Sequence, residues 1–250
     1  MTLIRTPLVE RRFGERGGFR WRGEEVQRIE AFSDAVMAFA VTLLVVSLEV
    51  PRTFAELLTT MNGFFAFALS FALLFRIWYL QYQFFRRYGL EDGFTIVLNA
   101  ALMFMVLFFV YPLKFLFAFL VKEFTGQDTR VLLADGSLVP AIGPQDMRTL
   151  MIVYGLGYLA IFGAFWLLYR HAWSRRDLLE LDPLERFDTR SSMLEIAINL
   201  GVGTLSVLIA SLADYRLAGL AGLTYILLAP GMTTFGMVRG RQRRRLEASF

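Results

Sequence analysis

The sequence predicts an all-α membrane protein with six transmembrane helices. Three observations support this fold class: 56% of the 250 residues are hydrophobic and 15% are aromatic, six apolar segments are long enough to cross a bilayer, and Lys and Arg gather in alternate connections. A soluble domain of this size could not bury so much apolar surface in one core. We therefore expect lipid to cover much of it.

Each predicted helix is an apolar run bounded by charged or turn-forming residues. Crossing about 30 Å of hydrocarbon takes roughly 20 residues of α-helix. The runs that fit are Phe32 to Val50, Phe64 to Phe85, Phe94 to Leu120, Leu150 to Tyr169, Met193 to Ala213 and Leu217 to Met237. Pro112 and Pro230 are expected to bend their helices or end them early. The longest connection, 121–149, carries several Gly and Pro residues and is expected to be an external loop.

The distribution of Lys and Arg predicts the orientation. Nineteen of the 26 lie on one side of the predicted membrane, five lie on the other, and Arg76 and Lys114 lie within apolar runs. Cytoplasmic segments collect such residues, so both termini are expected in the cytoplasm. The chain then divides into a basic cytoplasmic arm (1–31), a six-helix transmembrane domain (32–240) and a basic cytoplasmic tail (241–250). The arginine-rich start lacks the apolar run of a secretory signal.

The same composition argues against several other classes of protein. The basic tail directly follows an apolar helix, so we interpret it as a membrane flank and expect no nucleic-acid partner. The chain has no cysteine, which excludes disulfides, thiolate metal sites and cysteine nucleophiles. The only histidine, His171, is expected to be an interfacial anchor rather than a metal ligand. We therefore expect no enzyme activity, no catalytic or metal-binding residues, and no cofactor.

The first run is unusual because polar residues enter it, in the order Arg28-Ile29-Glu30-Ala31-Phe32-Ser33-Asp34. A membrane-embedded aspartate is costly and suggests a function or a structural partner. An apolar stripe lies within about 40° of one line on this helix, and its members are Phe32, Ala35, Phe39, Leu43, Val46 and Val50. Asp34 lies about 140° away and is expected, with Ser33, to face neighbouring helices. From spacing alone, ordinary helix packing is the favoured explanation of the stripe.

Further residues make the chain similar to a known family. Arg28, then Phe32-Ser33-Asp34, then Thr42 eight residues after Asp34, resemble the signature of the transmembrane protein 175 family. These are the potassium channels of endosomes and lysosomes, with bacterial and archaeal relatives. Weaker matches to the family's second and third helices are Ser70-Phe71, Trp78, Asn99 and Pro112. The single six-helix unit resembles the prokaryotic members, which assemble as tetramers.

The resemblance implies a potassium-selective channel in which the first helices of four copies surround the path. Layers of Phe39, then Leu43 and Val46, would form a hydrophobic constriction beside the Thr42 hydroxyl, and it would control conduction by size and wetting. The signature network would consist of Arg28, Phe32, Ser33, Asp34, Trp78 and Gln81. The implied partners are membrane lipid, three further copies of the chain and permeant K⁺, and the implied location is the cell membrane, crossed several times.

The sequence departs from the family pattern at two places. Phe39 stands where the family usually has Ile or Leu, and four such rings could narrow or close the path. Gln81-Tyr82 stands where the family commonly has a His pair, although Gln81 could still form a hydrogen bond near Ser33 and Asp34.

Two alternatives stay open at this point. Asp34 and Arg76 could belong to a proton pathway or a proton-coupled transporter. Arg76 could also pair with Asp34 or Glu30 of a neighbour, or reach an aqueous cavity. The second alternative is a membrane enzyme or an assembly scaffold. A convergent set of catalytic residues is lacking in the sequence, whereas a scaffold would follow if Phe39 seals the axis.

Overall fold

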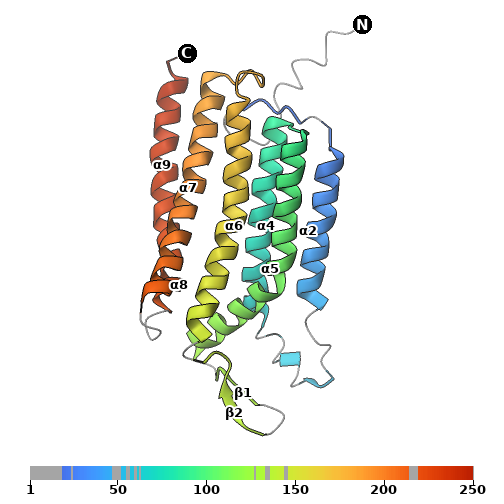
Figure 1. Cartoon of the computed structure of the whole chain (residues 1–250), viewed down its shortest axis with the longest axis vertical. Helices are drawn as coiled ribbons and strands as arrows, with labels where there is room; N and C mark the ends of the chain where they lie inside the picture. The colour runs from blue at the N-terminus through green and yellow to red at the C-terminus, as the bar shows by residue number, and fades with distance from the viewer. Residues whose placement is uncertain are drawn as a thin grey trace.

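Long helices lie side by side in one bundle in the computed structural model (Figure 1). The structure describes residues 19–23, 25–46, 52–54, 57–58, 61, 63–126, 128–132, 136–143, 146–213 and 219–249. A small hairpin projects at one end of the bundle, and the last described turn of helix α9 lies at the opposite end (Figure 1). The all-α class predicted from composition is therefore confirmed for the bundle, and the hairpin is an addition to it.

The long helices of the described residues are α2 (Arg28–Val46), α4 (Phe64–Tyr88), α5 (Gly93–Thr125), α6 (Asp146–Ser174), α7 (Pro183–Leu212) and α9 (Leu228–Glu247). Five stretches of helix are long and apolar enough to cross a membrane, and they lie in α4, α5, α6, α7 and the segment Leu220–Glu247. The remaining long helix, α2, has 19 residues and includes Arg28, Glu30 and Asp34. The chain is thus a multi-pass membrane protein, and α2 as a sixth span stays a prediction.

Local sequence signals determine where several helices begin and end. The Asp92 side chain accepts a hydrogen bond from the Thr95 backbone N–H and so caps α5. Asp182 and Glu185 form a capping box at the start of α7, where each side chain accepts from the other's backbone N–H. This box starts α7 at Pro183, ten residues before the predicted Met193. The predicted start was wrong because the first turns of α7 are polar, although they are regularly helical.

Proline has different effects in the two predicted helices that contain it. Pro112 lies inside α5, which runs on to Thr125, so it does not end that helix. Figure 1 shows α5 bent along its length, which is the usual effect of an internal proline. Pro230 lies in the first turn of α9, where its missing N–H costs nothing. The sixth predicted run is broken before it, into α8 (Leu220–Leu223) and the 3₁₀ turn η2 (Thr224–Leu227).

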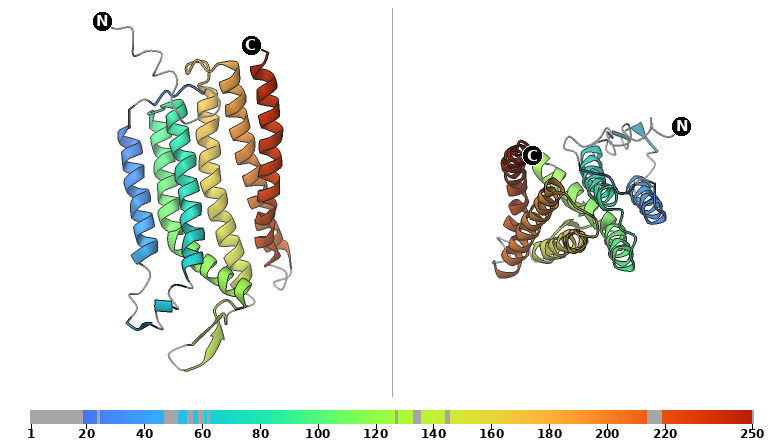
Figure 2. Two further views of the ribbon diagram at one scale, coloured as in Figure 1. Left: turned by 180° about the vertical axis from the view of Figure 1, so that it is seen from behind. Right: turned by 90° about the horizontal axis from the view of Figure 1, so that it is seen from above.

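The helices form two groups, α2 with α4 and α5, and α6 with α7 and α9. The two groups meet where α5 packs on α6. Helix α2 packs on α4 and α5, whereas α7 packs on α6 and on α9. Figure 2 shows α2 at one edge of the bundle and α9 at the opposite edge. A cluster of aromatic rings joins α4 to α6, with Tyr88 5.2 Å from Phe84 and 5.7 Å from Tyr169 between ring centroids. Tyr88 also donates a 2.8 Å hydrogen bond to Thr189 of α7.

The long connection between α5 and α6 contains a short antiparallel hairpin. Strands β1 (Arg130–Leu132) and β2 (Leu138–Pro140) pair with Val131 opposite Val139. Gly136 has a φ of 81° in the turn, a backbone conformation that glycine adopts without strain. The connection is therefore a loop with turns, as predicted, and its two strands were not predicted.

We predict that Gly89→Ala lowers the thermal stability of the purified protein. Gly89 ends α4 with a φ of 57°, and a Cβ atom there would lie 3.0 Å from the carbonyl carbon of Arg22. Left-handed backbone costs a non-glycine residue roughly 1 kcal/mol, and the crowding adds to it. Thermal unfolding in detergent measures the change. Gly93→Ala is the matched control, because a Cβ there meets nothing within 4 Å; equal midpoints for both variants would refute the prediction.

Candidate functional site

Helix α2 leaves one of its faces open. Phe32 and Phe39 are 58% and 56% exposed, and Ala35 between them is exposed as well. Thr42 lies on the same side, where its hydroxyl donates 2.9 Å to the Ala38 carbonyl of its own helix. Three members of the predicted apolar stripe therefore share an unpacked face.

The two other constriction residues lie differently. Leu43 is only partly exposed and packs against the core of the bundle. Val46 is the last residue of α2. Val50, the end of the predicted stripe, lies outside the described residues.

The opposite face of α2 is held by a buried chain of polar side chains. Gln81 of α4 donates 2.7 Å to the Asn99 side-chain oxygen of α5, and Asn99 donates 2.8 Å to the Ser33 hydroxyl. Ser33 in turn donates 2.8 Å to the Ile29 carbonyl. All three side chains are at most 2% exposed. Buried polar groups stabilise a fold only when they are paired, and here each one is. Three helices thus meet at one hydrogen-bonded line.

Asp34 lies at the edge of the open face and has a partner on α4. The Trp78 indole N–H donates a 2.7 Å hydrogen bond to the Asp34 carboxylate, and Asp34 otherwise stays exposed. Ser33 faces neighbouring helices as predicted, and Asp34 reaches one through Trp78. Arg28 is exposed in the first turn of α2 and has no hydrogen bond to this chain among the described residues, so its part in the network stays a prediction.

A second, charged contact was not predicted from the sequence. Glu30 in the first turn of α2 forms an ion pair of 2.8 Å with Arg86 of α4, and their side chains are 8% and 9% exposed. Arg86 also donates 2.7 Å to the Gly23 carbonyl, so it ties α4 to the chain that precedes α2. Two acidic residues four positions apart on α2 therefore serve different partners. In the sequence, Arg86 resembles an ordinary basic residue at the cytoplasmic end of a helix. It differs from one only in how deeply its side chain is buried, and a sequence does not record that depth.

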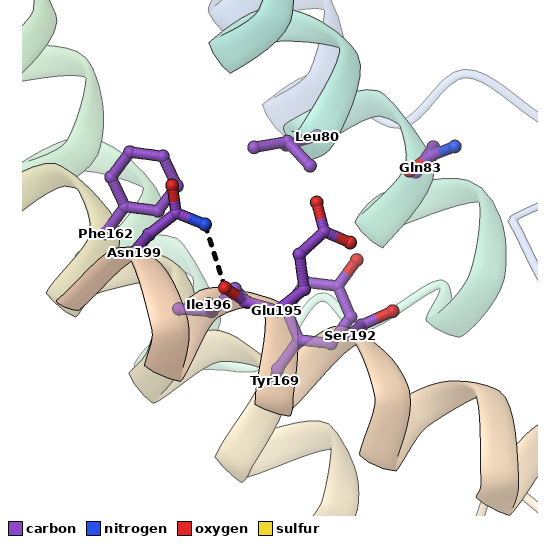
Figure 3. A pocket seen from close by; sticks show the side chains of 8 residues that line it. All are labelled: Leu80, Gln83, Phe162, Tyr169, Ser192, Glu195, Ile196 and Asn199. Carbon is purple, nitrogen blue, oxygen red and sulfur yellow. Dashed lines mark hydrogen bonds between the residues drawn. The ribbon is translucent and has the colours of Figure 1, made fainter. Parts of the chain in front are cut away.

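The partner of Arg76 is Glu195, which lies in the middle of α7. Their side chains are 2.8 Å apart and 47% and 35% exposed. Figure 3 shows Glu195 among the polar side chains that line a cavity between α4, α6 and α7, together with Gln83, Ser192 and Asn199. The volume of about 20 Å³ admits one water molecule and little else. Arg76 therefore pairs within its own chain, and the cavity is too small for an organic ligand.

His171, near the end of α6, pairs with an acidic residue. Its ring nitrogen lies 2.6 Å from the Asp92 carboxylate at the start of α5. Burial raises the pKa of Asp92, but hydrogen bonds from Thr95 and His171 outweigh it, so this pKa lies below its usual value. The contribution of Asp92 to stability is therefore present above the usual carboxyl pKa and is lost as the pH falls. Within the described part of the chain, no group of three potential metal ligands exists.

The chain is similar to named potassium channels. A potassium channel of Marivirga tractuosa is 42% identical over 231 residues, which cover 91% of this chain and 93% of that protein. The model of a family described as endosomal/lysosomal potassium channel TMEM175 matches residues 28–109. The chain belongs to the TMEM175 family. A potassium channel of Chamaesiphon minutus is 32% identical over 105 residues, 39% of this chain and 52% of that protein.

Two solved TMEM175 structures have the same fold. One is the crystal structure of a threonine-to-alanine variant of the potassium channel MtTMEM175, bound to a nanobody fusion protein. It has a TM-score of 0.78 and 39% identity, and the match covers 92% of this chain and all of that one. The other is a lysosomal potassium-selective channel TMEM175 homolog from Chamaesiphon minutus, with a TM-score of 0.55 over 85% of this chain and 96% of that one. At 24% identity, this second likeness shows the fold alone.

The TMEM175 match covers the helices that build the site. Residues 28–109 contain α2, α4 and most of α5. They therefore include all three side chains of the hydrogen-bonded line, Gln81, Asn99 and Ser33. From the sequence, Asn99 was expected to matter only as part of the family pattern. It is the central residue of the hydrogen-bonded line, because its side chain both donates and accepts a hydrogen bond. The signal that could have identified it is its position within an apolar run.

We predict that Gln81→Leu lowers the thermal stability of the purified protein. Leucine has a similar size but donates no hydrogen bond, so the Asn99 oxygen would stay buried and unpaired. Leaving such a group unsatisfied costs about 1–3 kcal/mol. Gln83→Leu is the control, since Gln83 lies half a turn away and forms no side-chain hydrogen bond among the described residues. Unfolding midpoints in detergent that fall equally in the two variants would contradict the prediction.

Proposed function

We propose that the protein is a potassium-selective channel of the cell membrane, in which four copies of α2 surround the conducting path. The observation that carries the proposal is the open face of α2, where Phe32 and Phe39 are more than half exposed. Because the other face of α2 is bound to α4 and α5 by buried hydrogen bonds, the open face is the side of the helix left to line a path between copies of the chain. Family membership supports the choice, because the named relatives are potassium channels. Passive conduction requires no enzyme chemistry, and none is proposed.

The constriction is assigned to the apolar side chains of α2. Phe39 lies near the middle of the helix, with Leu43 and Val46 one and two turns further along and Thr42 beside them. Rings of such side chains control conduction by their size and by excluding water, rather than by replacing the hydration shell with carbonyl oxygens. The proposed selectivity therefore depends on how closely four copies of α2 approach each other. Potassium is the permeant ion and no cofactor is involved.

The proposed topology has six spans, including α2, and both termini in the cytoplasm. The alternation of Lys and Arg supports this arrangement. The segment 1–31 is then a cytoplasmic arm that leads into α2, and 241–250 is a cytoplasmic tail, which continues α9 as far as Glu247. Lipid is expected around the rest of the 32–240 domain, and no nucleic acid is expected as a partner.

The flanks of α2 suggest how the copies meet. Because α2 packs on both α4 and α5, a closed ring places the α4 side of one copy against the α5 side of the next, which is a heterologous interface. The α4 side carries a ladder of aromatic rings, with successive centroids 5.4 to 6.3 Å apart, made by Phe67, Phe71, Phe75, Trp78 and Tyr82. The α5 side exposes Val97, Phe104 and Phe108. Both flanks are apolar, so the α4 side of one copy is suited to pack on the α5 side of the next.

The proposal is tested by potassium and sodium flux into vesicles that contain the purified protein. Wild type is expected to prefer potassium. Phe39→Ala is expected to raise the flux and weaken the preference, because four rings are removed from the constriction, and Thr42→Ala is expected to change the preference through the lost hydroxyl. Leu208→Ala is the control, an exposed leucine on α7 remote from α2. Absence of flux in wild type and in Phe39→Ala alike would favour an assembly scaffold.

A proton pathway is the second candidate function, and the exposed carboxylate of Asp34 is the observation that favours it. Asp34→Asn separates the two proposals. Asparagine keeps an oxygen for the Trp78 N–H, so a potassium channel is expected to retain most of its flux and its assembly. A proton carrier needs the ionisable group. Loss of all transport from an intact assembly, measured by flux and by size-exclusion chromatography, would support the proton pathway.

A further inference from the structure

A line of charged residues connects α7 to α2, although α2 packs mainly on α4 and α5. The four residues that form it are Glu185 of α7, Arg22 of the arm, Arg86 of α4 and Glu30 of α2, and we name them the arm clamp. Arg22 and Glu30 lie eight residues apart, whereas Arg86 and Glu185 come from distant parts of the sequence. The open face of α2 lies on the other side of the helix.

The first contact of the arm clamp joins α7 to the arm. Glu185 is 1% exposed and lies 2.6 Å from one Arg22 nitrogen and 3.2 Å from another. The backbone N–H of Arg20 donates 2.8 Å to the same carboxylate. The two guanidinium groups also reach the turn between α6 and α7, where Arg22 donates to the Leu179 carbonyl and Arg20 to that of Glu180. A carboxylate with this many donors holds the arm in one place.

The second contact joins the arm to α4. The backbone N–H groups of Arg22 and Gly23 both donate to the Arg86 carbonyl, at 3.1 and 3.3 Å. The Arg86 side chain returns a hydrogen bond of 2.7 Å to the Gly23 carbonyl. A Cβ atom on Gly23 would lie 2.6 Å from the Phe85 carbonyl oxygen, so only glycine permits this approach.

The third contact reaches α2 itself. Arg86 forms its buried ion pair with Glu30, and the same Glu30 oxygen accepts 2.9 Å from the Gln27 backbone N–H at the helix start. Gln27 also donates 3.2 Å to the Gly89 carbonyl. Separating buried charges leaves each of them unpaired, which is strongly unfavourable. The first turn of α2 therefore has one allowed position relative to α4 and the arm.

We infer that Glu185 and Arg22 are positioning residues for the conducting helix: through the arm clamp they hold the first turn of α2, and thereby the alignment of the constriction. This inference rests on the proposed function. Neither residue touches the proposed path. Loss of the Arg22–Glu185 contact weakens the attachment of the arm to α7 and allows the four copies of α2 to sit unequally around the axis, which lowers the preference for potassium over sodium.

The test is the ratio of potassium to sodium flux in vesicles, because a ratio does not depend on how much protein has folded. Glu185→Gln and Arg22→Gln are each expected to lower the ratio about fivefold, the effect of a remote coupling of ordinary size. The exchanged pair, Arg22→Glu with Glu185→Arg, is expected to restore much of it. Asp188→Asn is the matched control: Asp188 lies one turn further along α7 and pairs with Arg243 of α9.

Each outcome of this test supports or overturns one of the two proposals. A wild-type ratio near one would refute the proposed function, whereas a potassium-preferring wild type whose ratio is unchanged in both single variants would overturn the inference. An equal fall in Asp188→Asn would also overturn it, because any lost charge on α7 would then suffice.

If the single variants do not fold, Arg22→Cys with Glu185→Cys is used. The chain has no other cysteine, so a thiol cross-linker joins only these sites. Cross-linking is expected to raise the ratio, and an unchanged ratio would count against the inference.

Discussion

The hydrogen-bonded line from Gln81 through Asn99 to Ser33 is the contact on which the bundle around α2 depends. Only one face of helix α2 contacts the rest of its own chain, because the other face is open. The position of α2 is therefore determined by contacts on that one face. Apolar contacts alone permit a helix to slide or rotate, because any apolar side chain replaces another at little cost in lipid. A buried donor is satisfied only at its own acceptor, and this makes the line specific for one register.

The same requirement explains why polar residues lie at three depths in an otherwise apolar bundle. Near the end with the arm, Arg86 holds Glu30; one turn further along, the Ser33 line and the Trp78–Asp34 contact hold the second turn of α2. On the far side of α4, Arg76 and Glu195 link it to α7. In each case a group that is costly in hydrocarbon is matched to a partner on another helix, and each match limits how those helices move relative to each other.

The sequence predicted the order of the long apolar segments because lipid imposes a length on them, and five of the six are long and apolar enough to cross a membrane, whereas α2 as the sixth span stays a prediction. It did not predict where α7 begins, since the first turns of that helix are polar, yet Asp182-Pro183 with Glu185 is a helix-start pattern that could have been recognised. The stripe with Phe32, Ala35 and Phe39 was predicted from helical spacing, and the exposure of these residues agrees with it. Whether they line a path stays a prediction.

The long-range pairs were beyond prediction for a different reason. Arg76 and Glu195 are 119 residues apart and Arg22 and Glu185 are 163 apart, and nothing local in either segment identifies the partner. Arg22 and Glu185 looked like ordinary charges of cytoplasmic segments, and Arg76 and Glu195 lie within predicted apolar runs. Their pairing follows from how the two groups of helices dock, which is a property of the whole bundle. The family match, over 28–109, does not reach Glu185 or Glu195. The helices that carry the open face and the contacts that join them to the second half of the chain are thus separate features, and the family model covers only the first.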